Sequence, residues 1–272
     1  MKLFLRDEFK RLWQGKDPFC EVQKIKGDIY RNKEGRTTSQ VTIAGRSYFL
    51  KVHTGIGWNE IFKNIVQFRL PVIGASNEYL AAKKLTDLGV STLTTAAFGK
   101  RGWNPAKQLS FILTDDLNNT ISLEDYCAAW QEAPPEYKHR IALVRLLASV
   151  SRTMHKAGIN HRDYYICHFL LEKNNAAEPD NPRCYLIDLH RAQMRREVPE
   201  RWAIKDIAGL YFSAMNIGLT KRDCLRFMKI YGDGNLRQLD TEFWKKVNSV
   251  ALKLYQKDHG KESPCSDWWL TD

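Results

Sequence analysis

Short hydrophobic runs bounded by polar residues or Gly mark the first part of the chain. Two such runs, 41–44 and 47–52, are rich in β-branched and aromatic residues and flank a Gly-containing turn. A third run, 109–113, continues into polar residues from Thr114 onwards. Runs of this length and composition are typical of β-strands. We therefore expect a β-rich N-terminal lobe over residues 1–116.

A helical repeat of apolar positions characterises the part that follows. From Pro135 to His155 apolar residues recur at helical spacing, and Gly158 follows as a stop signal. This pattern predicts a long core helix. We expect a larger, mainly helical C-terminal lobe over residues 117–272, so the predicted fold class is α+β with two lobes.

A segment at about 53–75 separates the predicted strands from the helix that comes next. Its apolar residues recur at helical spacing, with Lys63 and Arg69 among them, until Pro71 interrupts the pattern. Two interpretations stay open. The segment is either a helix packed on the small lobe or an interfacial amphipathic helix that inserts aromatic side chains into a lipid surface or binds an acyl-bearing partner.

The candidate chemistry lies in two stretches of the C-terminal part. His161-Arg162-Asp163 is followed five residues later by His168, and Asp188 ends a short apolar run that starts at Cys184. In the phosphotransferase pattern H-R-D-L-x-x-x-N followed by D-F-G, the first Asp accepts the proton of the attacking hydroxyl and the second holds Mg²⁺. The order and spacing therefore indicate Asp163 as general base and Asp188 as metal ligand.

A kinase-like site also needs a strand lysine for the ATP phosphates and a helical glutamate that holds it. Lys51 stands near the end of a predicted strand, and Glu78 lies in the sequence 77–85, which has high helix propensity. Taken singly, each residue is better explained as an ordinary solvated charge than as part of a site. Their order before the catalytic loop favours a nucleotide-binding pair.

Composition limits the remaining choices. The chain has 272 residues, 43% of them hydrophobic, and a net charge of +11, which indicates a globular protein with an anionic partner. The sequence has no zinc-finger spacing, RNP-like motif or basic tail, so nucleic acid is not expected. Anionic lipid and acidic sugars fit the charge as well. The arginines at 191, 195, 196 and 201 form either a solvated face or a site for anionic sugars or phosphates.

Cysteine spacing and hydropathy bear on the compartment. Six cysteines include no C-x-x-C pair, which favours reduced thiols over disulfides or a zinc site. No apolar stretch is long enough to span a bilayer, and charges occupy the first eight residues, where a signal peptide would be apolar. We expect a cytoplasmic protein.

Several long motifs carry a resemblance to a known family. They are Gly15-Lys16-Asp17-Pro18-Phe19, Asn160-His161-Arg162-Asp163, Tyr165 to Leu171, Ile187 to Gln193 and Leu210 to Thr220. Together they resemble the lipopolysaccharide core heptose(I) kinases of Gram-negative bacteria over about Phe9 to Tyr231. The resemblance implies a protein-kinase-like fold and ATP- and Mg²⁺-dependent phosphorylation of the first heptose of the inner core.

The resemblance also implies site residues and partners. His161, Arg162 and Asp163 would be catalytic, Lys51 and Glu78 would bind the nucleotide, and Asp206 would support the catalytic loop. The acceptor would be the lipopolysaccharide inner core, at an anionic membrane surface on the cytoplasmic face of the inner membrane. An acyl carrier protein is a conceivable acidic partner, although no motif indicates it.

Two positions depart from the expected patterns. Tyr164 stands where this family is expected to have Cys, which we interpret as a tolerated local change. His168 stands where protein kinases have the Asn that holds a second Mg²⁺, so we assign it to the metal site with Asp188. Imidazole is a poor ligand for a hard cation, and a hydrogen bond from His168 to the loop or to a phosphate is the alternative.

Other functions stay open beside the heptose kinase. A kinase for Kdo or another sugar and a protein kinase use the same machinery. A non-catalytic kinase-like module that binds a membrane surface is the alternative outside enzymes, and the presence of Lys51, Asp163 and Asp188 argues against it.

Overall fold

The computed structural model describes residues 1–33, 35–55, 57–58, 62, 66, 74–173, 180–234 and 240–263. The chain divides into two compact units. The first comprises Met1–Lys84, Leu93–Asn118 and Leu189–Arg191; the second comprises Leu85–Thr92, Asn119–Asp188 and Ala192–Asp272. Most of the amphipathic segment predicted at about 53–75 lies outside the described residues.

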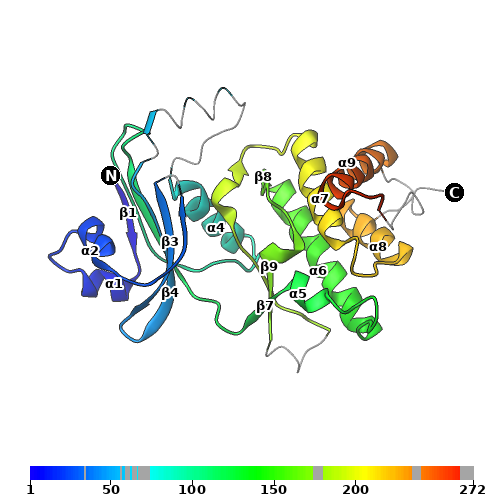
Figure 1. The fold of residues 1–272 in the computed structure, drawn as a ribbon, viewed down its shortest axis with the longest axis horizontal. Coiled ribbons are helices and arrows are strands. Elements are labelled where there is room, and N and C mark those ends of the chain that lie inside the picture. Colours follow the sequence, from blue (N-terminus) through cyan, green and yellow to red (C-terminus); the bar gives the residue numbers. More distant parts are fainter. Residues whose placement is uncertain are drawn as a thin grey trace. The chain divides into compact units, whose positions relative to one another are not determined.

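The first unit is built on a six-stranded antiparallel sheet in the order β1-β5-β6-β4-β3-β2 (Figure 1). The strands are β1 (Lys2–Leu5), β2 (Asp28–Lys33), β3 (Arg36–Ile43), β4 (Arg46–His53), β5 (Thr95–Arg101) and β6 (Leu109–Asp115). The β3–β4 hairpin turns at Ala44 and Gly45, both with positive φ. The strand lysine, Lys51, therefore lies on an inner strand, between Thr38 of β3 and Ile112 of β6.

An aromatic core covers one face of this sheet. Helices α1 (Asp7–Leu12) and α2 (Pro18–Lys24) contribute Phe9 and Phe19, and Trp13 lies between the helices. Phe19 meets Phe111 of β6 edge to face at a centroid distance of 5.3 Å. Phe9, Trp13 and Phe19 thus form part of the core of the first unit.

Helix α4 (Ser76–Asp87) covers the opposite face. Tyr79 of α4 stacks on Phe98 of β5 with ring centroids 4.2 Å apart, and both contact Ile112. Phe111 and Ile112 are consecutive, so they point to opposite faces of the sheet. The two faces are therefore covered by different helices, and the consecutive apolar residues 111–113 of β6 reflect burial on both sides.

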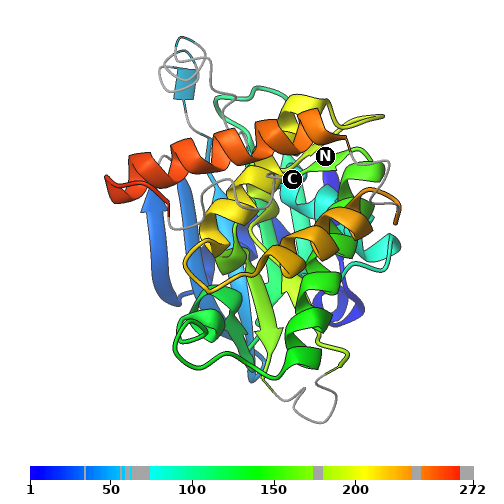
Figure 2. The ribbon, with the colours of Figure 1, turned by 90° about the vertical axis from the view of Figure 1, so that its right-hand side faces the viewer.

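The second unit is mainly helical (Figures 1 and 2). Its helices are α5 (Leu123–Cys127), α6 (Tyr137–Lys156), α7 (Glu200–Ala214), α8 (Lys221–Tyr231) and α9 (Thr241–His259). Helix α9 packs along α7, and α6 packs on α8. Short strands lie beside them: β7 (Thr120–Ser122), β8 (Ile159–Asn160), β9 (Phe169–Glu172), β10 (Cys184–Leu186) and β11 (Gln193–Met194). The β-rich first unit and the helical second unit confirm the predicted α+β class.

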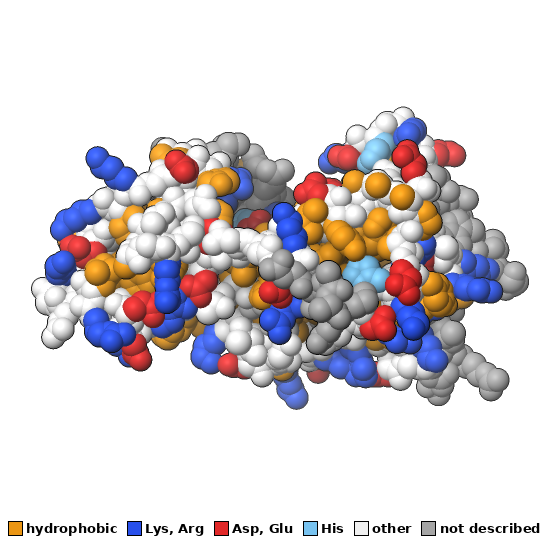
Figure 3. All heavy atoms as spheres, turned by 90° about the horizontal axis from the view of Figure 1, so that it is seen from below, with side chains coloured by type: hydrophobic (Ala, Val, Ile, Leu, Met, Phe, Trp, Pro, Cys, Tyr) orange, Lys and Arg blue, Asp and Glu red, His pale blue; other side chains and the backbone are white. Residues whose placement is uncertain are grey.

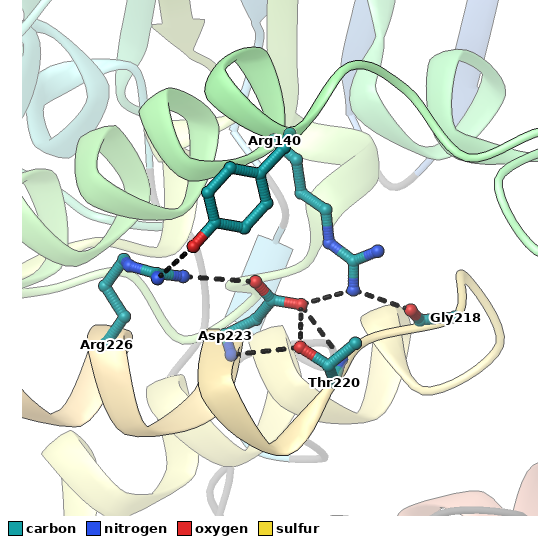
Figure 4. Close-up of polar contacts among 6 residues, drawn as sticks. Arg140, Gly218, Thr220, Asp223 and Arg226 are labelled. Carbon is teal, nitrogen blue, oxygen red and sulfur yellow. Dashed lines mark hydrogen bonds and ion pairs between the residues drawn. The ribbon is translucent and has the colours of Figure 1, made fainter.

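A polar network joins α6 to the start of α8 (Figure 4). Arg140 of α6 forms an ion pair with the buried Asp223 and donates to the carbonyl of Gly218 at 2.8 Å. Asp223 also completes a capping box with Thr220, whose hydroxyl donates to the carboxylate at 2.6 Å. Arg226 binds the other carboxylate oxygen at 3.3 Å. This network fixes the beginning of α8 against α6.

Candidate active site

In the first unit, Lys51 and Glu78 form a direct ion pair. The Nζ atom of Lys51 lies 2.6 Å from Oε1 of Glu78, and the side chains are 15% and 1% exposed. Lys51 lies directly across from Ile112 on β6, so it points to the face that α4 covers. The first turn of α4 brings Glu78 to the same face. The two residues that the sequence suggested as partners are therefore in contact.

In the second unit, the buried carboxylate of Asp206 holds the catalytic loop. It accepts hydrogen bonds from the backbone N–H of His161 at 2.6 Å and of Arg162 at 2.8 Å. Asp206 lies on α7 and is 1% exposed. Hydrogen bonds from backbone N–H groups to a carboxylate are charge-assisted, and they are stronger than hydrogen bonds between neutral groups. The sequence assigned Asp206 to support of the loop, and the geometry fits this assignment.

Two further residues, which the sequence did not single out, extend the hydrogen-bond network of Asp206. His155 of α6 lies 3.4 Å from Asp206 through Nε2, and its Nδ1 is 2.7 Å from the hydroxyl of Tyr231 on α8. These residues are separated from Asp206 by 51 and 25 positions in the sequence. No local motif connects them, so only the packing of α6, α7 and α8 reveals the network.

Hydrogen bonds also tie together the segments that carry the two acids. His161 is fully buried, and its Nε2 lies 2.9 Å from the carbonyl of Ile187, the residue before Asp188. The carbonyl only accepts, so Nε2 carries the proton. Burial lowers the pKa of His161 and keeps the ring neutral. In the opposite direction, the backbone N–H of Ile187 donates to the carbonyl of His168 at 2.9 Å.

His168 links both acids more directly. Its Nδ1 donates to the backbone carbonyl of Asp163 at 2.6 Å, and its Nε2 lies 3.7 Å from the carboxylate of Asp188. Burial acts to lower the pKa of His168. Hydrogen bonds with the Cys167 side chain and the Asp163 carbonyl, together with the charge of Asp188, outweigh burial and raise the pKa to about 9. The imidazole therefore favours its charged, hydrogen-bonding form.

The backbone is unusual at both acid-bearing segments. Arg162 has φ of 77° and Asp188 has φ of 62°, values that side chains larger than Gly rarely adopt. Conformations of this kind cost about 1–3 kcal/mol each and persist where the surroundings enforce them. Asp188 stands two residues beyond the end of β10, and its carboxylate is 30% exposed. Asp163 is also partly exposed, so both acids are accessible.

The base of the catalytic loop is locked by close packing. Gly158 has φ of 76°, and a Cβ there would lie 2.0 Å from the carbonyl oxygen of Arg195. The Arg195 guanidinium donates to the side chain of Asn160 at 2.6 Å. Of the arginines that the sequence left between two interpretations, Arg195 is thus a structural residue. Tyr164, which stands where Cys is expected, is 1% exposed. Its hydroxyl lies 2.8 Å from Oγ of Ser151, so the buried polar group of the larger side chain has a hydrogen-bond partner.

The fit to a metal ion depends on Asp188. Within the described residues, no group of three or more His, Cys, Asp or Glu side chains is placed to hold a metal. A Mg²⁺ ion usually takes one or two carboxylates and completes its shell with water and substrate phosphates. An accessible hard carboxylate such as Asp188 fits this mode of binding, in which the nucleotide supplies further ligands.

The second unit also contains an apolar pocket. It has a volume of about 100 Å³ and is lined by side chains of α5 to α9 and of the segments between them, among them Leu123, Trp130, Leu143, Ile207, Ala214, Phe227 and Trp244. Asp223 of the network in Figure 4 is the one acid in its described lining. Figure 3 shows hydrophobic side chains gathered on the surface of this unit, on the side where α5 and α6 lie in Figure 1.

Comparison with known proteins decides the family. The sequence model of the lipopolysaccharide kinase (Kdo/WaaP) family matches residues 20–231. The chain belongs to this family. Among curated members, lipopolysaccharide core heptose(I) kinase WaaP of Pseudomonas aeruginosa is 49% identical over 260 residues, 94% of this chain and 97% of that protein. WaaP of Escherichia coli K12 is 49% identical over 249 residues, 92% of this chain and 94% of that protein.

A solved structure of a Kdo/WaaP family member supports the fold. The structure described as WaaP in complex with acyl carrier protein matches with a TM-score of 0.83 and 43% identity. The match covers 94% of this chain and all of that one. The protein-kinase-like α+β fold predicted from the sequence is therefore confirmed, and the protein is a kinase of the Kdo/WaaP family.

Proposed function

We propose that this protein transfers the γ-phosphoryl group of ATP to a hydroxyl of the first heptose of the lipopolysaccharide inner core. The observation that carries the proposal is the 49–50% identity, over most of the chain, to proteins named lipopolysaccharide core heptose(I) kinase. The side chains that phosphoryl transfer requires accompany this identity. Lys51 and Glu78 are paired in the first unit, and the two accessible acids lie in the second.

Each residue of the catalytic loop has a distinct role in this proposal. Asp163 accepts the proton of the heptose hydroxyl, because it is an accessible carboxylate on a loop held from behind by Asp206. The buried ring of His161 cannot touch a substrate, so His161 is a positioning residue for the loop and for the segment of Asp188. Arg162 is partly exposed to solvent, and its backbone N–H donates a hydrogen bond to the carboxylate of Asp206.

Lys51 and Glu78 bind the nucleotide in the proposal. The lysine ammonium neutralises charge on the ATP phosphates, and Glu78 holds the ammonium in position. Since Glu78 is 0% exposed and Lys51 remains partly exposed, the lysine is the member of the pair that reaches the nucleotide.

Mg²⁺ is the cofactor that the fold implies, and it would neutralise phosphate charge when bound. Asp188 would hold it. His168 Nε2 lies 3.7 Å from the carboxylate of Asp188. The hydrogen bond from His168 Nδ1 to the carbonyl of Asp163 supports the hydrogen-bonding role predicted for His168, and metal ligation stays a prediction.

An acyl carrier protein is the proposed protein partner. The solved relative described above was determined with acyl carrier protein, and the present chain contains an apolar pocket in its second unit. We propose that the pocket receives the apolar end of an acyl chain, because burial of each CH₂ group gains about 0.8 kcal/mol.

Binding to acyl carrier protein can be measured by titration calorimetry. Acyl-loaded carrier protein should bind the wild type more tightly than unacylated carrier protein. Ala214→Phe, which fills the pocket, should abolish that difference, whereas Ser249→Phe on the exposed side of α9 should keep it. Equal affinity of the wild type for both forms would exclude the pocket as the acyl site.

The proposed location is the anionic inner-membrane surface. Trp58, Phe62 and Val66 are spaced by four residues and are 48%, 60% and 76% exposed. Such spacing places them on one helix face. None of the described helices is long and apolar enough to cross a bilayer. Lys and Arg are interspersed with Asp and Glu on the face in Figure 3, so the net charge is not gathered into one patch there.

Vesicle sedimentation tests the membrane contact. Trp58→Ser/Phe62→Ser should bind vesicles of anionic phospholipid less tightly than the wild type. Trp103→Ser, which changes a 92% exposed tryptophan elsewhere in the first unit, serves as the control. Wild-type binding by the folded double variant would contradict a membrane role for this face.

The reaction itself is tested with ATP, Mg²⁺ and a lipopolysaccharide core that lacks phosphate on the first heptose. Mass spectrometry should find one phosphate on that heptose, and Asp163→Asn should lose the transfer. Phosphate on Kdo would instead indicate the sibling sugar kinase. Mg²⁺-dependent ATP binding that disappears in Asp188→Ala would separate an enzyme from a non-catalytic module.

A further inference from the structure

Helix α7 presents a basic face to a pocket of about 300 Å³ in the second unit. Arg201, Lys205 and Gly209 are spaced by four residues, so they lie on one side of the helix. All three line the pocket, together with Arg162 of the catalytic loop. The volume is at the lower end of the range of about 300–1,000 Å³ found for small-ligand sites.

The three cationic side chains converge on one indole. The guanidinium carbons of Arg162 and Arg201 lie 5.2 and 5.4 Å from the ring centroid of Trp202. Nζ of Lys205 lies 5.5 Å from the same centroid. Cations within about 6 Å of an aromatic face are attracted by its quadrupole. Trp202 thus helps to hold three like charges close together.

The described lining of this pocket contains no carboxylate. Its remaining residues are Tyr164, Tyr165, Ile204, Gly209, Val250 and Leu254. Positive side chains that gather in a hollow with low-dielectric walls raise the local concentration of anions. The lining therefore has the composition of an anion-binding site with apolar walls, and it differs in this respect from the apolar pocket between α5 and α9.

The pocket adjoins the loop that carries Asp163. Arg162 and Tyr164 line it, and these residues flank Asp163 in the chain. At Gly209 a Cβ would lie 3.0 Å from the carbonyl oxygen of Tyr164, so the absent side chain allows α7 to approach the loop closely. A group bound here would be held between α7 and the loop that carries Asp163, the residue that we assign as base.

We propose that Arg162, Arg201 and Lys205 form a subsite for an anionic group of the acceptor, either a sugar carboxylate or a phosphate. Guanidinium groups bind both through paired N–H donors. This inference rests on the proposed phosphorylation of a lipopolysaccharide sugar. It adds that recognition uses negative charge beside the accepting hydroxyl, so that a neutral heptose alone is a poor acceptor.

The test compares Arg201→Gln and Lys205→Gln with Arg145→Gln, which removes a charge from an exposed position on α6. Each pocket variant should raise the KM for the acceptor about tenfold, the loss expected for one charge-assisted hydrogen bond. The KM for ATP should stay unchanged, and Arg145→Gln should behave like the wild type. An unchanged acceptor KM in both pocket variants would overturn the inference.

Chemically altered acceptors identify the anionic group. If a carboxylate binds, reduction of the acceptor's carboxyl groups should weaken the wild type about tenfold and leave Arg201→Gln unaffected. If a phosphate binds, removal of the lipid phosphates should instead weaken acceptor binding by the wild type about tenfold and leave Arg201→Gln unaffected. An equal loss in wild type and variant for both acceptors would refute the subsite. If phosphoryl transfer fails, calorimetry without ATP can measure the affinity of the wild type and of Arg201→Gln for the native and the altered acceptors, and the same differences are expected.

Discussion

The carboxylate of Asp206 accepts the backbone N–H of His161 at 2.6 Å, across 45 positions of sequence. Asp206→Asn keeps the size of the side chain but removes its charge, and the amide can turn only one oxygen to the two N–H donors. We expect kcat to fall at least tenfold because the loop of Asp163 loses its anchor. Steady-state kinetics with circular dichroism as the folding control would measure this. A folded variant with wild-type kcat would show that the loop needs no anchor.

The Lys51–Glu78 pair should behave as a coupled unit in stability. Lys51→Met leaves the charge of Glu78 in a site where it is 0% exposed, so we expect a loss of about 3 kcal/mol in the free energy of unfolding. Lys51→Met/Glu78→Leu removes both charges and should recover most of that loss. Urea denaturation measures both. Additive losses in the double variant would contradict the coupling.

His53 should make stability depend on pH. Burial, and then the positive charges of Arg36, Lys51 and His190, lower its pKa from 6.5 to about 4. The unfolded state therefore binds a proton at a higher pH than the folded state does. Stability is complete above pH 6.5 and falls as the pH drops towards 4, by up to about 3 kcal/mol.

The measurement is urea denaturation of the wild type and of His53→Gln at pH 7 and pH 5. The variant lacks the titrating group, so its stability should fall less over this interval. Equal falls in the two proteins would mean that His53 titrates at its ordinary pKa.

The network around Asp223 should contribute more than a helix cap alone. Asp223→Ala removes the ion pair with Arg140 and the capping contacts of α8, and the lost contacts are buried. We expect a cost of about 3 kcal/mol. Asp240→Ala removes only the N-cap of α9 from an exposed site, for about 1 kcal/mol. Thermal unfolding should rank the two variants in this order, and the reverse ranking would contradict the role of the network.

Local sequence signals were sufficient for part of the fold, namely β3, β4, β6, α4 and α6. The two runs around Gly45 became β3 and β4, and the repeat from Pro135 to His155 became α6, which spans Tyr137–Lys156. Lys51 and Glu78 meet because alternation in β4 and the first turn of α4 fix their directions. The division of the chain at residue 116 stays a prediction.

Contacts between residues that are far apart in the sequence could not be predicted from local sequence patterns. His155 and Tyr231 reach Asp206 only after three helices pack, and nothing in their own sequence marks them. Lys205 and Trp202 were likewise not singled out, although the spacing of Arg201, Lys205 and Gly209 could have indicated a shared helix face. The roles of Phe9 and Trp13 were missed because short aromatic segments have weak periodicity.

The bond from His161 to the carbonyl of Ile187 has a mechanical consequence. It joins the loop of Asp163 to the segment of Asp188, and the bond from Ile187 to His168 closes the connection in the other direction. Hydrogen bonds in both directions therefore resist separation of the two acid-bearing segments. In the proposed reaction, this double connection favours a constant spacing between Asp163 as base and Asp188 as metal ligand.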